Sequence, residues 1–480
     1  MSLFEQLMTS APVQIVVVGD TIVDESVYGE ITGYAQEACP IFKEHRRRYS
    51  PGGAAKIAYN LAVLGARVNF VTCANLQMTS VSRVTQKLDA VGVILDLLPR
   101  QGYRNEIKTR YHVGEEQIHM RHDTPWAWYA QSSEGTVAYL ARSSAYTGVY
   151  AVYADYGKGM MPAGWRPMGD PRHTLINMRG PAGLHDCDTA VLNLAELSAL
   201  TGIAYDNSVH TRTRMYGILR GRATITNLVS TAGADCVMCY SGDRCTMSTL
   251  PKPLIVKNVV GGGDAVVAIT ALLRAHNLPV DCQLAARAGQ LSVQRRLDWA
   301  ALLPELRLPG TPALHVAGQN IAQVLSKLRV PGLRSPVIGF TNGCFDVMHA
   351  GHMKFLSDAA RQCDYLFVAV NGDESVHRLK GDGRPVQPLA QRIAAVQAHP
   401  GVTAVVTQEE LTPHALLQQI RPTYLFKGYG YASTEDAVGH ELVTAYGGAV
   451  KIIPDGLPGF STTETITACG GNACSSGVGN

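Results

Sequence analysis

Short apolar runs alternate along the chain with longer segments in which apolar residues recur every three or four positions. The runs predict buried β-strands, and the longer segments predict helices between them. The expected strands are Gln14–Val18, Val68–Thr72, Gly148–Tyr153, Ala190–Leu192, Val337–Thr341, Leu366–Val370, Val402–Val406 and Val450–Ile453. The expected helices include Ala54–Leu64, Ala265–His276, Met353–Gln362 and Pro413–Ile420. This alternation predicts an α/β fold with parallel sheets.

The chain is too long for a single hydrophobic core. Its 480 residues suggest two or three domains, at about 150 residues per domain. The stretch Leu306–Pro336 carries four prolines around a helix-like piece, Gln319–Leu328, and is typical of an interdomain connection. We therefore expect domains at 1–312 and 337–469, a linker at 313–336, and a disordered tail rich in Gly, Ser and Asn at 470–480.

The composition excludes several classes of protein. A hydrophobic fraction of 46% with 17% charged residues is that of an ordinary soluble globular protein. The net charge of +3 is scattered, apart from Arg46–Arg48, so no nucleic-acid partner is expected. No apolar stretch approaches the roughly 20 residues of a membrane helix, and the start does not resemble a signal peptide. The 11 cysteines lack framework spacing, and Cys236 and Cys239 are expected to be reduced structural thiols. A cytoplasmic enzyme without membrane insertion is the expectation.

The segment from Thr341 to His352 carries the strongest chemical signal. A hydrophobic strand ends in a tight turn, and His349 and His352 follow where a helix begins. A helix N-terminus offers free N–H groups and a positive dipole end to a phosphate. Neighbouring imidazoles can donate hydrogen bonds to oxygens that gain charge during phosphoryl transfer. Two half-buried histidines at a helix start are the alternative for so short a pattern.

The complete segment resembles the HxGH signature of the cytidylyltransferase-like nucleotidyltransferases. Further motifs follow in the family's order, at Asn371–Asp373, Arg378–Gly381, Arg384–Val386, Gln391–Arg392, Phe426–Gly428 and Ser461–Thr463. The resemblance implies a Rossmann-like domain with His349 and His352 as catalytic residues. It also implies a set of nucleotide-binding residues: Thr341, Asn342, Gly343, Phe345, Asp346, Gly351, Lys380, Arg384, Lys427, Gly428, Ser461, Thr462 and Thr463.

A second candidate site lies in the N-terminal half, at Gly261–Gly263 and Asp264. Successive glycine N–H groups form an anion cradle at a helix start. Asp264 beside them could accept the proton of a sugar hydroxyl that attacks a γ-phosphate. A glycine turn with Asp264 as an ordinary helix N-cap is the alternative.

Other segments of this half resemble the ribokinase-like (PfkB) carbohydrate kinases. They are Pro51–Ala55 with Asn60–Ala62, Asp155–Gly159 and Asn193–Glu196, in the family's order. The resemblance implies Asp264 as the catalytic base. It implies ATP and Mg²⁺ binding by Asn193, Glu196, Gly261, Gly262 and Gly263, with Glu196 as metal ligand. It implies sugar binding by Asp20, Asp24, Gly52 and Gly53.

The two modules in this order resemble the bifunctional heptose-7-phosphate kinase/heptose-1-phosphate adenylyltransferases. The resemblance implies that both domains use ATP, that Mg²⁺ is the cofactor, and that sugar phosphates are the substrates. It further implies a separate phosphatase between the two steps and a homodimer formed through the kinase-like domain.

Several residues depart from these families. Lys56 stands where the kinases have Asn, Asn177 where they have Asp, and Val260 where they have Thr. In the transferase half, Tyr429-Gly430 replaces Gly-Asp. These departures leave an alternative open: a transferase for another sugar phosphate, joined to a non-catalytic sugar-binding or dimerising N-terminal domain.

Overall fold

The computed structural model describes residues 3–98, 102–114, 117–125, 127, 148–161, 167, 170–178, 184–204, 208–233, 236–249, 261–294, 313–428, 431 and 433–453. The chain forms two compact units. The larger unit comprises Pro12–Leu302 and Val330–Leu333, and the smaller unit comprises Met1–Ala11, Leu303–Arg329 and Arg334–Asn480. Each unit has its own sheet, and we describe each by itself.

A nine-stranded sheet forms the centre of the larger unit, in the order β13-β12-β11-β10-β9-β8-β1-β4-β5. Its strands are β1 (Gln14–Gly19), β4 (Arg67–Thr72), β5 (Ile94–Leu97), β8 (Tyr150–Asp155), β9 (Thr174–Met178), β10 (Cys187–Asn193), β11 (Ile225–Thr231), β12 (Cys236–Ser241) and β13 (Arg244–Thr249). The strands from β5 to β11 pair in parallel, whereas β12 and β13 are antiparallel. Apolar side chains on nearly every position of β1, β8 and β10 are buried, as expected for strands covered on both faces.

Helices of the larger unit follow the strands. They are α2 (Ala54–Val63), α3 (Thr79–Ala90), α5 (Leu194–Thr201), α6 (Val209–Arg222), α7 (Gly262–Ala275) and α8 (Cys282–Gln294), with a 3-10 turn η2 at Pro171–His173. The apolar sequence of α7 is buried from Asp264 to Leu273, so this helix lies within the core rather than on its surface.

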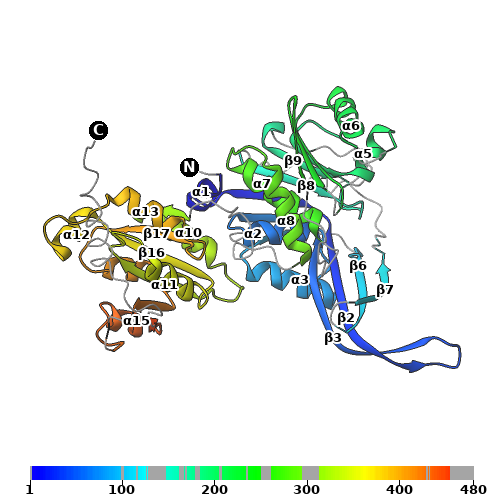
Figure 1. Ribbon diagram of the computed structural model, residues 1–480. Coiled ribbons are helices and arrows are strands. Elements are labelled where there is room, and N and C mark those ends of the chain that lie inside the picture. The colour runs from blue at the N-terminus through cyan, green and yellow to red at the C-terminus, as the bar shows by residue number, and fades with distance from the viewer. Residues whose placement is uncertain are drawn as a thin grey trace, which may run out of the picture. The chain divides into compact units, whose positions relative to one another are not determined.

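A second, four-stranded sheet has the order β3-β2-β6-β7. Its strands are β2 (Thr21–Tyr34), β3 (Pro40–Gly53), β6 (Ile107–Val113) and β7 (Gln117–Thr124). Figure 1 shows β2 and β3 as a long ribbon that extends beyond β6 and β7. The ends of β2 and β3 that join the nine-stranded sheet carry Asp24, Gly52 and Gly53.

The smaller unit is built on a six-stranded parallel sheet of order β14-β17-β16-β15-β18-β19. Its strands are β14 (Leu314–Val316), β15 (Ile338–Gly343), β16 (Tyr365–Asn371), β17 (Ala404–Gln408), β18 (Tyr424–Gly428) and β19 (Ala449–Ile453). Its helices are α1 (Leu3–Thr9), α10 (Ile321–Leu328), α11 (Ala350–Ala360), α12 (Asp373–Lys380), α13 (Leu389–Gln397), α14 (His414–Ile420) and α15 (His440–Ala445), with η3 at Gly318–Asn320. The expected α/β class is confirmed in both units.

The stretch expected to connect the domains contains structure of its own. β14 pairs with β17, and α10 packs against α1 near the start of the chain. The ammonium of Lys327 on α10 is buried and donates hydrogen bonds to the carbonyl oxygens of Leu7 and Ser10, the second at 2.9 Å. The smaller unit therefore includes the N-terminal helix; the limits of the functional domains stay a prediction.

Within the described residues, no helix combines the length and the apolar character needed to cross a membrane.

Candidate active sites

In the smaller unit, β15 ends where the chain turns toward α11. Asn342 and Gly343 reach the C-terminal edge of the sheet, and both neighbours of β15 run parallel to it. Ligands of open parallel sheets bind at this edge. The turn is tight, because a Cβ on Gly343 would lie 3.2 Å from the ring of Phe345. Phe345 itself has a φ of +47°, a value that non-glycine residues rarely adopt.

The two predicted catalytic histidines meet at the start of α11. His349 is the N-cap residue, and its ring centroid lies 3.8 Å from that of His352. Burial, and then the proximity of His349, lower the pKa of His352 to about 4. At this pKa the imidazole of His352 is neutral at physiological pH, so it can offer an N–H group but not a positive charge. A neutral donor beside a helix N-terminus suits an oxygen that gains charge during the reaction.

Lys427 approaches the same turn from the neighbouring strand β18. Its side chain is 5% exposed, and its ammonium donates a 2.7 Å hydrogen bond to Oδ1 of Asn342. Burial lowers the pKa of Lys427 to about 8. The ring of Tyr431 lies 5.6 Å from the ammonium. A cation held at this position can attract the phosphates of a nucleotide.

Asp346 holds the loop after α12 in place. Its carboxylate accepts hydrogen bonds from Arg384 at 2.7 Å and from the N–H groups of Val386 and Gln387. Burial acts to raise the pKa of Asp346, but the hydrogen bonds from Arg384 and the two amides together lower it. The described contacts of Asp346 are thus structural, and they direct Arg384 toward the turn after β15.

Arg392 on α13 is fully buried and joins three parts of the site. Its guanidinium donates to the carbonyl oxygens of Cys344, Asn371 and Gln387, and to Asp373. Sequence reasoning noted Arg392 within a motif but left it out of the site. The available signal was a charged residue within the apolar sequence of α13 (Leu389–Gln397).

These residues surround a cavity of about 430 Å³. Its lining is Asn342, Gly343, Cys344, Phe345, Asp346, His352, Asn371, Leu379, Lys380, Arg384, Leu411, Pro413, Lys427, Tyr431 and Val438. Most of the predicted nucleotide-binding residues are thus brought together. Thr341 is buried below the turn, Gly351 lies in the first turn of α11, and Gly428 ends β18. Ser461, Thr462 and Thr463, like Tyr429 and Gly430, lie outside the described residues.

In the larger unit, the predicted glycine turn begins α7. Gly261 is the N-cap, with a φ of +92° that strongly favours glycine. Its carbonyl accepts a hydrogen bond from Ser292 at 3.1 Å, and a Cβ on it would lie 3.3 Å from Cε of Lys56. A Cβ on Gly262 would lie 3.2 Å from Val293, whereas a Cβ on Gly263 would meet no described neighbour within 4 Å outside the backbone of its own helix. The lysine that replaces the family's asparagine therefore lies beside the expected anion cradle.

Asp264 lies in the first turn of α7 and is 9% exposed. The hydroxyl of Tyr156, which follows β8, donates a hydrogen bond to its Oδ1 atom. Sequence reasoning placed Tyr156 in a family loop without giving it a role. The base predicted from the sequence is thus a buried carboxylate at a helix N-terminus.

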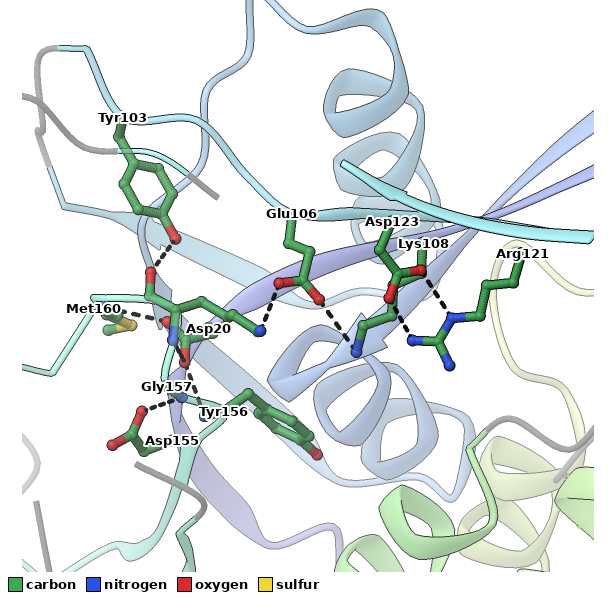
Figure 2. Close-up of polar contacts among 11 residues, drawn as sticks. Asp20, Tyr103, Glu106, Lys108, Arg121, Asp123, Asp155, Tyr156, Gly157 and Met160 are labelled. Atoms are coloured by element: carbon green, nitrogen blue, oxygen red, sulfur yellow. Dashed lines mark hydrogen bonds and ion pairs between the residues drawn. The ribbon is translucent and has the colours of Figure 1, made fainter. Parts of the chain in front are cut away.

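The predicted sugar-binding aspartates have different surroundings. Asp20 is 1% exposed and accepts hydrogen bonds from three backbone N–H groups, those of Tyr156, Lys158 and Met160. Burial, and then the charge of Asp155, raise the pKa of Asp20 to about 6. Figure 2 shows this carboxylate facing the loop that it holds.

Asp24 on β2 lies among cations. It forms a 2.9 Å ion pair with Arg110, and a Cβ on Gly52 would lie 2.6 Å from its Oδ2 atom. Burial raises the pKa of Asp24, opposed by Arg110 and more weakly by Lys108 and Lys56. Gly52 therefore allows the Asp24 carboxylate to lie close against the backbone of β3.

Asn193 and Glu196 form a capping box at the start of α5. The Asn193 side chain accepts the N–H of Glu196 at 2.9 Å, and Glu196 accepts the N–H of Asn193 at 2.8 Å. This pairing explains the helix start without a ligand. Carboxylate and amide oxygens are also the donors that Mg²⁺ prefers, so the residue types fit the expected metal. Groups of three or more His, Cys, Asp or Glu suited to a metal are absent from the described part of the chain.

The folds and sites define a carbohydrate kinase joined to a nucleotidyltransferase. Residues 178–304 match the model of the pfkB family carbohydrate kinases, and residues 340–468 match the Cytidylyltransferase-like model. The Bifunctional protein HldE of Nitrobacter hamburgensis is 34% identical, covering 95% of this chain and 96% of that protein. The Bifunctional protein HldE of Alcanivorax borkumensis is 31% identical, covering 95% and 97%. The chain belongs to the HldE family and is a bifunctional kinase and nucleotidyltransferase.

Among solved structures, the phosphofructokinase-2 from Escherichia coli in complex with fructose-6-phosphate covers 61% of this chain and 97% of its own, with a TM-score of 0.48 and 13% identity. This similarity is too low to support a conclusion about the chain.

Proposed function

We propose that the larger unit phosphorylates the anomeric hydroxyl of a heptose 7-phosphate with MgATP, and that the smaller unit converts heptose 1-phosphate and ATP to ADP-heptose and pyrophosphate. The observation that carries the proposal is the cavity at the turn after β15, where His352, Lys427 and Arg384 converge. Full-length membership of a bifunctional family favours two activities over a transferase with a non-catalytic N-terminal domain.

In the first step, the sugar oxygen attacks the γ-phosphorus of ATP and ADP leaves. Asp264 takes the hydroxyl proton, and the N–H groups at Gly261–Gly263 receive the phosphate oxygens. Asp24 holds the sugar, together with the backbone at Gly52 and Gly53. Asn193 and Glu196 would hold Mg²⁺, which supplies charge neutralisation between the phosphates. Asp20 belongs to the proposed sugar site through the loop that it holds.

In the second step, a phosphate oxygen of the sugar 1-phosphate attacks the α-phosphorus of ATP, and the bond to the β-phosphate breaks. His349 and His352 face the transferring phosphoryl group, and Lys427, Lys380 and Arg384 attract the triphosphate. Positioning and electrostatic stabilisation are sufficient for this chemistry, because no covalent enzyme intermediate is required.

The test incubates the full chain with MgATP and a panel of hexose and heptose phosphates. We expect ADP release with heptose 7-phosphate and pyrophosphate release with heptose 1-phosphate. Pyrophosphate release with another sugar 1-phosphate, without any ADP release, would support the alternative function.

The remaining expectations are part of the proposal. A separate phosphatase removes the distal phosphate between the two steps, because the first product carries two phosphates and the second substrate carries one. We propose a cytoplasmic homodimer that forms through the four-stranded sheet of the larger unit. In support, Tyr34, Ile41 and Met120 on its strands are 71%, 49% and 51% exposed. Analytical ultracentrifugation of a variant with charged residues at Tyr34 and Ile41 tests the dimer.

A further inference from the structure

The hydrogen bond from Tyr156 to Asp264 links two segments 108 residues apart. Both side chains are buried, at 8% and 9% exposure. The bond is made at one of the two carboxylate oxygens, so it fixes the rotation of the carboxylate at the end of its side chain. We infer that Tyr156 is a positioning residue for the kinase base, which it holds in the orientation and the ionised form needed to accept a proton. This inference rests on the proposed kinase function.

Asp20 fixes the backbone from which Tyr156 projects. Its Oδ2 atom accepts the N–H groups of Tyr156 at 2.9 Å and Lys158 at 3.2 Å, and its Oδ1 atom accepts that of Met160 at 3.2 Å. Figure 2 shows the Tyr156 ring directed away from Asp20 and Asp155. A carboxylate that accepts three amides of one loop, at residues 156, 158 and 160, acts on the loop, and through it on Tyr156.

The same loop is also fixed to the four-stranded sheet. The ammonium of Lys158 forms a 2.6 Å ion pair with Glu106, which also pairs with Lys108 of β6 at 3.4 Å. The hydroxyl of Tyr103 donates to the carbonyl oxygen of Lys158 at 3.2 Å. Figure 2 shows this row of contacts running from the loop to β6. The loop that carries Tyr156 is thus held by Asp20 and also by Glu106 and Tyr103. A fixed loop keeps the Tyr156 hydroxyl in place before the reaction begins.

The chemical reason concerns the protonation of the base. A hydrogen bond donated to a carboxylate favours the ionised form and lowers its pKa. Lys56 of α2 also lies near the start of α7, beside Gly261. Arg274 and its partner Asp188 of β10 lie at the opposite end of α7, and α8 contributes Arg287. Loss of the tyrosine hydroxyl should therefore raise the pKa of Asp264 and misalign it.

The test compares Tyr156→Phe with Tyr150→Phe in the full chain. Tyr150 is the first residue of β8, the strand that Tyr156 follows. Its hydroxyl donates a 2.9 Å hydrogen bond to Asp188, so each variant loses one buried tyrosine–carboxylate hydrogen bond. For Tyr156→Phe we expect kinase kcat to fall about tenfold or more with little change in KM, since general bases contribute about 100-fold or more. The acid limb of its kcat–pH profile should move up by about one pH unit. Tyr150→Phe should change neither quantity.

A second variant tests whether Asp20 acts through the loop that carries Tyr156. Asp20→Asn keeps one acceptor oxygen and replaces the other with a donor, so it should reproduce the fall in kcat and the shift of the acid limb. Near-ultraviolet circular dichroism and thermal unfolding of the full chain serve as the folding control for all three variants, because the substituted residues lie in the larger unit.

The outcomes separate the two levels of the proposal. An unmutated chain without kinase turnover would overturn the kinase function and this inference with it. A working kinase whose kcat and acid limb are unchanged in Tyr156→Phe overturns the inference alone. A rise in kcat or a fall in KM in Tyr156→Phe also overturns the inference. In that case the Tyr156 hydroxyl would be competing with the sugar hydroxyl for the Asp264 carboxylate.

Discussion

Single residues show how far a motif determines chemistry. The positions of Asp20 and Asp346 follow from their motifs, but their hydrogen-bond partners do not. Asp20 accepts amides of a loop 136 or more residues away, and Asp346 accepts those of Val386 and Gln387. Tertiary contacts over such distances leave no local pattern in a sequence. The places of Asp264 and His352 at helix starts, and of Lys427 near the end of a strand, were predictable from the apolar runs and glycines beside them, whereas their roles stay predictions.

Lys427 gives a prediction about pH. Since burial lowers its pKa to about 8, the charged form is lost as the pH rises through this value. We expect the transferase KM for ATP to be steady near neutral pH and to rise above about pH 8. Lys427→Ala should have a KM raised about tenfold or more at pH 7, with a smaller fall in kcat. A KM for ATP that is unchanged in the variant would make Lys427 an ordinary buried lysine.

Lys56 gives a prediction about the departure from the kinase family. Its side chain lies beside Gly261, so its charge should assist MgATP binding at the cradle. Lys56→Asn, which restores the family residue, should raise the kinase KM for MgATP about tenfold. Arg83→Asn removes an exposed charge from α3 and is the matched control. Equal KM values for the two variants would contradict a role in nucleotide binding.

At the scale of elements, the buried strands were the most predictable part. β1, β8, β10, β15, β16, β17 and β19 overlap the expected apolar runs, and α2, α7, α11 and α14 overlap the expected helices. The ribbon of β2 and β3 was missed. Its outer half alternates half-buried and exposed residues, and Arg46–Arg48 lies within β3, so no apolar run marks it.

The N-terminal helix α1 gives the prediction at this scale. Lys327 caps its carbonyl end from α10 and is 3% exposed. Lys327→Ala leaves two carbonyls without this donor, and should lower the free energy of unfolding of the smaller unit by about 2 kcal/mol. Arg361→Ala removes an exposed ion pair with Asp358 and should cost about 0.5 kcal/mol or less. Chemical denaturation of the two variants, followed by loss of pyrophosphate release, compares the stability of their smaller units. Equal denaturation midpoints would show that the contacts of Lys327 with α1 contribute no more stability than an exposed ion pair.

At the scale of the whole molecule, each unit has its own parallel sheet, and each has a candidate site among the residues that follow or end its parallel strands. The order of the modules was predictable because each has its own glycine- or histidine-bearing turn. The path of the chain was not, since Met1–Ala11 precedes the larger unit in sequence and packs within the smaller one. The composition of Met1–Ala11 does not indicate whether the segment packs in the larger or in the smaller unit.

The central claim is that one chain carries two separate phosphoryl-group chemistries. Its most direct measurement uses full-length Asp264→Asn and His352→Ala. It follows the release of ADP from ATP with heptose 7-phosphate as acceptor, and of pyrophosphate from ATP with heptose 1-phosphate as acceptor. Asp264→Asn keeps the shape of the base without its basicity, and His352→Ala removes a preorganised donor. We predict that Asp264→Asn loses about 100-fold or more of ADP release and keeps pyrophosphate release, and that His352→Ala does the reverse. Two results would contradict this assignment. One is ADP release by Asp264→Asn, or pyrophosphate release by His352→Ala, at nearly the unmutated rate. The other is a folded variant that has lost both reactions.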